Sequence, residues 1–345
     1  MATAFTLPLL DGLADEASAA EETQRRLPRV TWRVRRGPVL HANPLSDDPS
    51  VLSLNLTQGC MQRCTFCSIR GHASYRGDEE INLYANSAKL LEAELARRTV
   101  RPRAVVLCPS SDPFAPSLLI QQETLSLIRV LAEAGIESWL MTRGLIRPVI
   151  FEGMLPHRDK VRLRIAMTTG DRQLQRSIEP LTAPPVLRLR QLRELRRAGF
   201  RVDVAIEPLL LGVTDTRENL KPLFRSLAEV GVENVSVGYA FLRTGIRANI
   251  ERTLEEAGLE IDALDEAYRK GPILTSGLIA AARYLPKLRR ERSYGSLIAW
   301  GEEVGIRVSV CRTTNPDFHP ANSGQSASRP RLSLLSLLAN ANHAG

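Results

Sequence analysis

The most constraining feature of the sequence is a group of three cysteines within eight residues, Cys60-Met-Gln-Arg-Cys64-Thr-Phe-Cys67. This Cys-x3-Cys-x2-Cys spacing directly follows an apolar run, Val51–Leu56, that predicts a β-strand. Three thiolates on one short loop can face a single inorganic centre. A cubane iron–sulfur cluster normally takes four thiolates, so three leave one iron with an open coordination position. Open positions on metal centres are where chemistry takes place.

A structural zinc loop is the alternative interpretation. Zinc needs a fourth nearby Cys or His, and structural sites usually have a second Cys-x2-Cys pair. The other two cysteines, Cys108 and Cys311, are single and distant in the sequence, and His72 has no second histidine beside it. The spacing and the missing fourth ligand therefore favour a cluster over zinc.

The cysteine loop resembles the signature of the radical S-adenosylmethionine (SAM) enzymes. The resemblance implies that Cys60, Cys64 and Cys67 hold a [4Fe-4S] cluster. It also implies that SAM chelates the fourth iron through its amino and carboxylate groups. Phe66, the aromatic residue before the last cysteine, would then lie near the adenine.

Length and composition fit one large α/β domain with extensions, since 345 residues can bury a sizeable core. No apolar run is long enough to span a membrane, and the N-terminus lacks the basic start of a secretion signal. With five cysteines, three of them in one loop, a disulfide framework is not expected. We therefore predict a reducing, cytoplasmic location and no membrane partner.

The net charge of +8 favours an anionic partner only weakly, because much of it can be solvated surface. Apolar and polar side chains alternate over residues 30–35, which predicts a short edge strand with Trp32 among arginines. A basic strand beside the core is the favoured interpretation. The same residues could also bind a phosphate backbone and stack a base.

From Val51 onward, short apolar runs alternate with segments of helical period. The predicted strands are Val51–Leu56, Ala104–Leu107, Ser138–Met141, Val161–Met167, Val202–Ile206 and Val235–Tyr239. The predicted helices are Ala85–Arg98, Gln121–Ala134, Pro148–Leu155, Val186–Ala198 and Arg217–Val230. Such alternation predicts parallel strands with right-handed crossovers. Six units suit a partial (βα) TIM barrel, the fold that the radical SAM resemblance also implies.

The chain divides into four expected regions: an N-terminal extension over residues 1–50, a radical SAM core over 51–257, a C-terminal helical extension over 258–312 and a flexible tail over 313–345. Residues up to about Glu22 are expected to be disordered. In the C-terminal extension, we expect helices over Leu254–Arg269, Thr275–Tyr284 and Ser296–Val304, and a last strand over Ile306–Val310.

Polar residues follow several predicted strands, where the active sites of barrels lie. The motifs Ser-Asp-Pro-Phe-x-Pro, Thr-Arg and Glu-Pro-x4-Pro-x2-Arg resemble the spore photoproduct lyase-like branch over about residues 51–257. That resemblance implies that Ser111 and Asp112 receive the SAM amino group and that Arg143 meets the SAM carboxylate. Thr168 or Thr169 would approach the ribose.

Cys108 is a candidate catalytic residue, because these lyases have a cysteine before Thr-Ser-Asp that returns a hydrogen atom to the product. Here the cysteine precedes Pro-Ser-Ser-Asp and stands one residue further away. A small buried residue at a strand end is the alternative for Cys108, and a core thiol is favoured for Cys311. Phe66 also departs from the branch, which uses a tyrosine near the last cluster cysteine.

These features predict a radical SAM enzyme. It would cleave SAM to a 5′-deoxyadenosyl radical that takes hydrogen from a substrate. The first expectation is a nucleic acid substrate, with an electron donor such as flavodoxin or ferredoxin. The alternatives are modification of a peptide or small metabolite and, in a different class, a non-catalytic iron–sulfur electron carrier. Fold alone cannot choose between them.

Overall fold

The structure is a computed structural model. It describes residues 27–43, 46, 48–71, 75, 77, 79–243, 245–259, 262–276, 279–312 and 314–318. The segment expected to be disordered up to about Glu22 lies outside these residues, as do His72 and, within the expected tail of 313–345, residues 313 and 319–345. None of the helices in the described ranges is both long and apolar enough to cross a bilayer.

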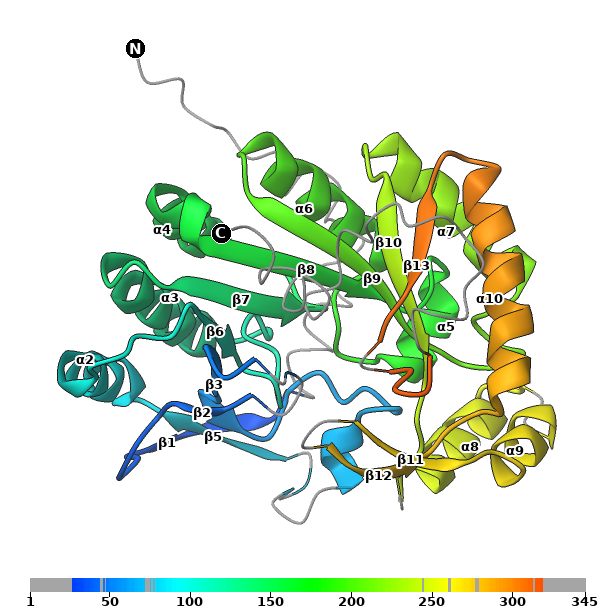
Figure 1. The fold of residues 1–345 in the computed structure, drawn as a ribbon, viewed down its shortest axis with the longest axis horizontal. Helices are drawn as coiled ribbons and strands as arrows, with labels where there is room; N and C mark the ends of the chain where they lie inside the picture. Colours follow the sequence, from blue (N-terminus) through cyan, green and yellow to red (C-terminus); the bar gives the residue numbers. More distant parts are fainter. Residues whose placement is uncertain are drawn as a thin grey trace.

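The centre of the fold is an eight-stranded sheet in the order β13-β10-β9-β8-β7-β6-β3-β2 (Figure 1). Every pairing in it is parallel except that of β2 with β3. The strands are β2 (His41–Ala42), β3 (Val51–Leu54), β6 (Ala104–Leu107), β7 (Glu137–Thr142), β8 (Val161–Met167), β9 (Arg201–Leu209), β10 (Asn234–Tyr239) and β13 (Arg307–Val310).

The predicted α/β class with a mostly parallel sheet is confirmed. The six predicted strands are all present, and β13 adds a further parallel strand beside β10. The six-unit partial barrel and the four regional boundaries remain predictions.

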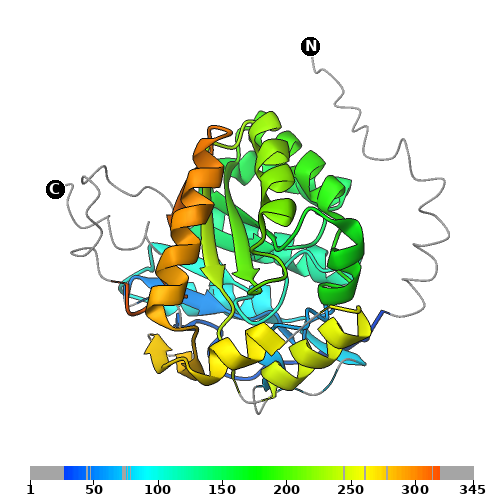
Figure 2. The same cartoon turned by 90° about the vertical axis from the view of Figure 1, so that its right-hand side faces the viewer.

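Helices follow the strands and pack around the outside of the sheet (Figures 1 and 2). They are α2 (Ser87–Arg97), α3 (Leu118–Glu133), α4 (Pro148–Met154), η2 (Leu155–Lys160), α5 (Arg172–Ile178), α6 (Pro185–Arg197), α7 (Arg217–Glu229) and α10 (Lys287–Glu302). Side chains cap some of them: the Ser117 hydroxyl accepts from the Ile120 amide at the start of α3. Glycines in the left-handed region follow α3, α6 and α7, at Gly135, Gly199 and Gly231.

The core lies between the sheet and these helices and is almost entirely aliphatic. Leu107 of β6, Leu140 of β7, Ile206 of β9 and Leu227 of α7 are all buried. Burial of each such side chain contributes about 1.5–3 kcal/mol to the free energy of folding. This burial holds the helices against the sheet. The strands are buried on both faces, which explains why they read as continuous apolar runs.

The N-terminal strand β1 (Arg29–Arg33) is present as predicted, at the edge of a second sheet. It pairs with β5 (Glu80–Tyr84), which pairs in turn with β4 (Thr57–Gln58). Trp32 is 49% exposed, so the alternation buries Val30 better than the tryptophan. A basic edge strand with an exposed aromatic side chain results.

The C-terminal part differs from prediction. The segment expected to form a helix over Thr275–Tyr284 instead forms the antiparallel hairpin β11 (Ile273–Ser276) and β12 (Ile279–Arg283), so that prediction was wrong. Backbone bonds between Leu242 and Arg283 tie β12 to the chain leaving β10. Two shorter helices, α8 (Ile246–Glu256) and α9 (Asp262–Arg269), lie where one was expected.

Helix α10 offers a paired test of the packing against β13. A Cβ at Gly301 would lie 2.6 Å from the Ile306 carbonyl oxygen, whereas one at Gly295 meets nothing within 4 Å. Gly301→Ala should therefore lower the free energy of unfolding by about 1–3 kcal/mol. Gly295→Ala should raise it by about 0.5–1 kcal/mol, because alanine favours helix. Urea unfolding of both variants measures this, and equal effects would contradict the packing.

Candidate active site

The cysteine loop leaves the sheet after β3 and β4 and ends in the 3-10 helix η1 (Ser68–Gly71). Two short turns shape it: the Cys67 amide donates to the Cys64 carbonyl at 3.2 Å, and the Arg70 amide donates to the Cys67 carbonyl at 3.1 Å. The Thr65 amide donates to the Ile178 carbonyl at 3.0 Å, which fixes the loop to the end of α5. The loop is therefore anchored at the carboxyl edge of the sheet.

All three thiols of this loop line one small cavity, together with Gln62, Arg63, Ile69, Arg70 and Tyr75. Cys64 is buried, and Cys60 and Cys67 are partly buried. Burial raises the pKa of each thiol. Against that, the Arg143 guanidinium lowers the pKa of Cys64 and of Cys67. Thiols with a raised pKa stay protonated unless a metal centre binds them as thiolates.

The donor chemistry of this loop fits a cubane cluster with three protein ligands, because each thiolate would bind a different iron. The cysteines open onto one cavity from a single loop, which is the arrangement that a cubane with three protein ligands requires.

Arg143, at the end of β7, connects this loop to the neighbouring strand ends. Its guanidinium lies over the Phe66 ring, 5.1 Å from the centroid. Its Nη1 donates to Glu179 Oε1 at 3.1 Å, and its Nη2 donates to the Glu207 carbonyl at 2.5 Å. The sequence-predicted pair Phe66 and Arg143 is thus brought together beside the cysteines.

Glu179 is the carboxylate around which this region is built. It is fully buried, and Arg188 Nη2 donates to its Oε2 at 2.5 Å. The Thr168 hydroxyl also donates to it. Burial acts to raise the pKa of Glu179, but Arg188 and Arg143 outweigh burial, and the pKa lies below its usual value. The carboxylate therefore stays charged between two guanidinium groups.

Asp112 lies beside the cysteine loop as predicted and is buried. Its two oxygens accept from the Phe114 amide at 2.8 Å, Gln62 Nε2 at 2.9 Å, the Thr142 hydroxyl at 2.7 Å and the Arg143 amide at 2.7 Å. Burial raises its pKa in spite of these bonds. Asp112 joins three loops, and its contact with SAM remains a prediction.

The remaining candidates lie around the same edge. The Ser111 hydroxyl accepts from the Thr57 hydroxyl at 2.8 Å. Thr168 and Thr169 are buried at the end of β8, where Thr168 meets Glu179 and Thr169 donates to Asn219. Cys108 is buried with a positive φ of 58°, and burial raises its pKa to about 11.

Sequence reasoning gave no role to Glu179, Arg188 or Gln62. Glu179 and Arg188 do appear in the Glu-Pro-x4-Pro-x2-Arg motif, so their nine-residue separation was available as a signal. What the sequence does not reveal is that both side chains are buried as an ion pair. Gln62, between Cys60 and Cys64, carried no signal in the sequence.

No protein-family model matches the chain. Uncharacterized proteins of Mycobacterium tuberculosis and Mycobacterium bovis are each 29% identical to it over 238 residues, covering 66% of this chain and 69% of theirs. An uncharacterized protein of Acidianus two-tailed virus is 23% identical over 197 residues, covering 53% of this chain and 65% of that protein.

Solved structures show the fold. A spore photoproduct lyase complexed with dinucleoside spore photoproduct matches with a TM-score of 0.61 at 16% identity, covering 82% of each chain. A mutant of that lyase with bound SAM and dinucleoside spore photoproduct matches with a TM-score of 0.61, covering 81% of each chain. This chain has the fold of spore photoproduct lyase. The resemblance predicted from the sequence is confirmed at that level.

The Glu179 ion pair can be tested by stability. Glu179→Gln leaves two buried guanidinium groups without their carboxylate and should lower the free energy of unfolding by about 3–5 kcal/mol. The difference in the free energy of unfolding between this variant and the parent should begin to narrow below about pH 4.5, the ordinary pKa of a glutamate. Below that pH the parent loses stability, because the charged form of Glu179 is the form that stabilises the fold.

Glu194→Gln is the matched control. Glu194 pairs with Arg197 at 3.4 Å on the surface of α6, where such pairs contribute about 0–1 kcal/mol. Urea unfolding at several pH values compares the two variants. Equal losses in both would contradict the central role of Glu179.

Proposed function

We propose that this chain is a radical SAM enzyme. The observation that carries the proposal is the set of three thiols opening onto one cavity beside Arg143, at the carboxyl edge of a parallel sheet. Cys60, Cys64 and Cys67 would hold a [4Fe-4S] cluster. When bound, such a cluster supplies the electron that cleaves SAM to methionine and a 5′-deoxyadenosyl radical able to take hydrogen from a substrate.

The protein's own residues would bind and orient SAM. Arg143 is the cation suited to the SAM carboxylate, because a guanidinium binds carboxylates through two parallel hydrogen bonds. Ser111 and Asp112 would receive the amino group, and Phe66 would lie near the adenine. Thr168 or Thr169 would approach the ribose. These side chains are buried or half-buried, and hydrogen bonds to Ser111, Asp112 and Arg143 would hold them in place before SAM arrives.

The first candidate substrate is nucleic acid, acted on in a photoproduct lyase-like reaction. The exposed Trp32 on the basic strand β1 and the net charge of +8 support it. In such a reaction, Cys108 would return a hydrogen atom to the product. A flavodoxin- or ferredoxin-like donor and a reducing cytoplasm complete the proposal.

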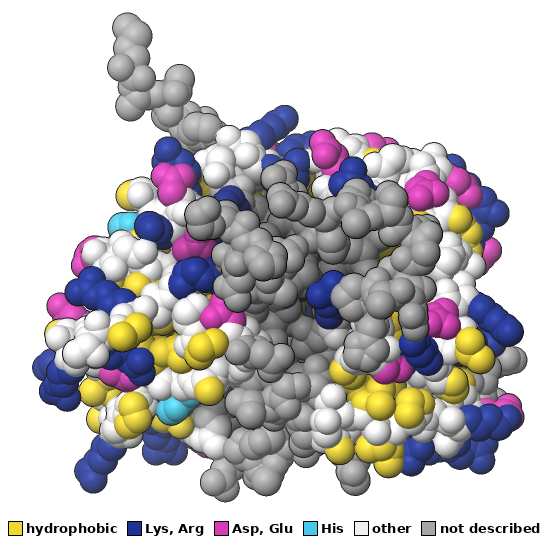
Figure 3. Space-filling view, viewed as in Figure 1, with side chains coloured by type: hydrophobic (Ala, Val, Ile, Leu, Met, Phe, Trp, Pro, Cys, Tyr) yellow, Lys and Arg dark blue, Asp and Glu magenta, His cyan; other side chains and the backbone are white. Residues whose placement is uncertain are grey.

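The alternative substrates are a peptide or a small metabolite. On the face seen in Figure 3, Lys and Arg side chains are interspersed with Asp and Glu and form no single basic field. A surface of mixed charge is compatible with a peptide or small-metabolite substrate. A non-catalytic electron carrier is less well supported, because a carrier has no need of Arg143 and Asp112 beside its cluster.

The cluster is tested by anaerobic reconstitution. The parent should bind iron and sulfide and should release 5′-deoxyadenosine from SAM with a reductant. Cys64→Ala should lose most of the iron and this activity, because two thiolates hold a cubane poorly. Cys311→Ala, which removes a buried thiol away from the loop, should keep its iron. Zinc alone in the parent, or unchanged iron in Cys64→Ala, would refute the cluster.

The substrate class is tested by salt titration of binding to irradiated and unirradiated DNA. Arginines that contact phosphates release counterions, so binding should weaken steeply with salt. Replacing Arg29 and Arg33 together by Gln should flatten the slope of log K against log salt by about two. Arg307→Gln, on β13, is the control. Binding that ignores salt would favour a peptide or metabolite, and equal, weak binding to both DNAs would exclude photoproduct repair.

A further inference from the structure

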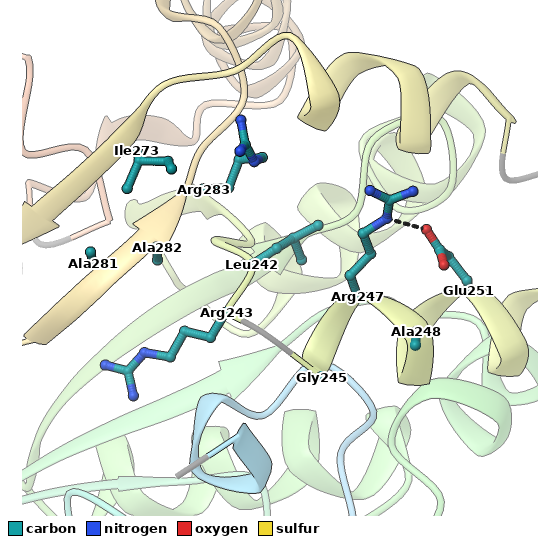
Figure 4. Close-up of a pocket in the computed structure, with 10 residues that line it drawn as sticks. All are labelled: Leu242, Arg243, Gly245, Arg247, Ala248, Glu251, Ile273, Ala281, Ala282 and Arg283. Carbon is teal, nitrogen blue, oxygen red and sulfur yellow. Dashed lines mark hydrogen bonds and ion pairs between the residues drawn. The ribbon is translucent and has the colours of Figure 1, made fainter.

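A cavity of about 540 Å³ lies between α8 and the β11–β12 hairpin (Figure 4). Its floor is formed by Leu242, Arg243, Gly245 and the first turns of α8, and Ala281 and Ala282 of β12 face it from above. The paired backbones of Leu242 and Arg283 fix the two walls to each other. The volume falls in the range of sites for small organic ligands.

The charged lining of this cavity is mainly positive. It has three arginines, Arg243, Arg247 and Arg283, and one acid, Glu251. Arg247 Nε donates to Glu251 Oε1 at 2.6 Å, so these two charges largely offset each other. Arg283 Nη1 donates to the Gly271 carbonyl at 2.9 Å and thereby supports the base of the hairpin.

Arg243 differs from the other two arginines. Its Nε is buried and has no hydrogen-bond partner among the described residues. In Figure 4 its guanidinium extends below Ala281 and Ala282, away from the Arg247–Glu251 pair. A buried guanidinium nitrogen without an acceptor is costly, and an anionic ligand would supply the acceptor.

The cavity is coupled to the cysteine loop through α8. Arg247, Ala248 and Glu251 line the cavity, and the neighbouring Asn249 donates from Nδ2 to the Thr65 carbonyl at 2.6 Å. Thr65 lies between Cys64 and Cys67. The loop that ends in η1 passes beside α8 in Figures 1 and 4. A ligand held here would therefore lie next to the loop proposed to hold the cluster.

We propose that this cavity binds a phosphate group of the substrate, with Arg243 as the principal contact. The inference rests on the proposed function and specifies where its substrate is anchored. A phosphodiester fits better than an isolated carboxylate, because the walls also offer apolar surface at Ala281 and at Ile273, which is 61% exposed. That surface suits the sugar and base on either side of a phosphate, while the guanidinium takes two phosphate oxygens.

Calorimetry on the reconstituted full chain tests the proposal with three probes: a thymidine dinucleoside monophosphate, its uncharged methylphosphonate analogue, and N-acetylglutamate. The parent should bind the charged dinucleotide at least tenfold more tightly than either other probe. Arg243→Gln should weaken that binding about tenfold or more. Ala281→Glu, at an exposed rim position, should weaken it as well by adding a negative charge.

Arg252→Gln is the matched control on α8, because Arg252 is 67% exposed and does not line the cavity. It should bind the dinucleotide like the parent. Equal affinity for the charged and uncharged dinucleotides, tighter binding of N-acetylglutamate, or parent-like binding by both cavity variants would overturn the proposal. SAM cleavage by the same parent preparation separates the failures. Selective dinucleotide binding without SAM cleavage would refute the proposed function alone.

Discussion

The carboxyl edge of this sheet depends on one charge removed from water, the carboxylate of Glu179. Isolated in a dry interior it would cost several kcal/mol, and it is kept there by two guanidinium groups and threonine hydroxyls. Arg188 brings α6 to this carboxylate, and Arg143 brings the end of β7 and, through its ring contact, Phe66. Replacing Glu179 would therefore disturb the cysteine loop and the ends of β7 and β8 together.

Asp112 performs a related task nearby but with backbone donors. Its oxygens accept hydrogen bonds from the backbone amides of Phe114 and Arg143 and from the side chain of Gln62 in the cysteine loop. Because no arginine side chain forms an ion pair with Asp112 among the described residues, the effect of burial prevails over the hydrogen bonds, and the pKa of Asp112 is raised. The two carboxylates thus lie in one environment, but their pKa values are shifted in opposite directions, since arginine side chains form ion pairs with Glu179.

Much of the fold could be predicted because parallel strands that are buried on both faces are written as apolar runs. The cysteine loop, Phe66 and Arg143 lie near one another, as residues that follow parallel strands do when the strand ends meet at one edge of a sheet, and their roles stay predictions. The hairpin at Ile273–Arg283 was mistaken for a helix because its alanines favour helix locally. Pairing of Arg283 with Leu242, forty-one residues away in sequence, overrides that preference. The Glu179–Arg188 pair was missed for a different reason: burial of charge leaves no mark on a single sequence.

The edge strand β1 has a consequence for how copies of this chain meet one another. A free strand edge is a template on which a second chain can add a strand. Here that edge is only five residues long, and Arg29 and Arg33 both approach Glu80 on the neighbouring strand. In the eight-stranded sheet, the edge strand β13 is four residues long and begins with the exposed Arg307. Short edge strands with charged side chains oppose edge-to-edge aggregation, so a second copy of the chain is not expected to extend either sheet.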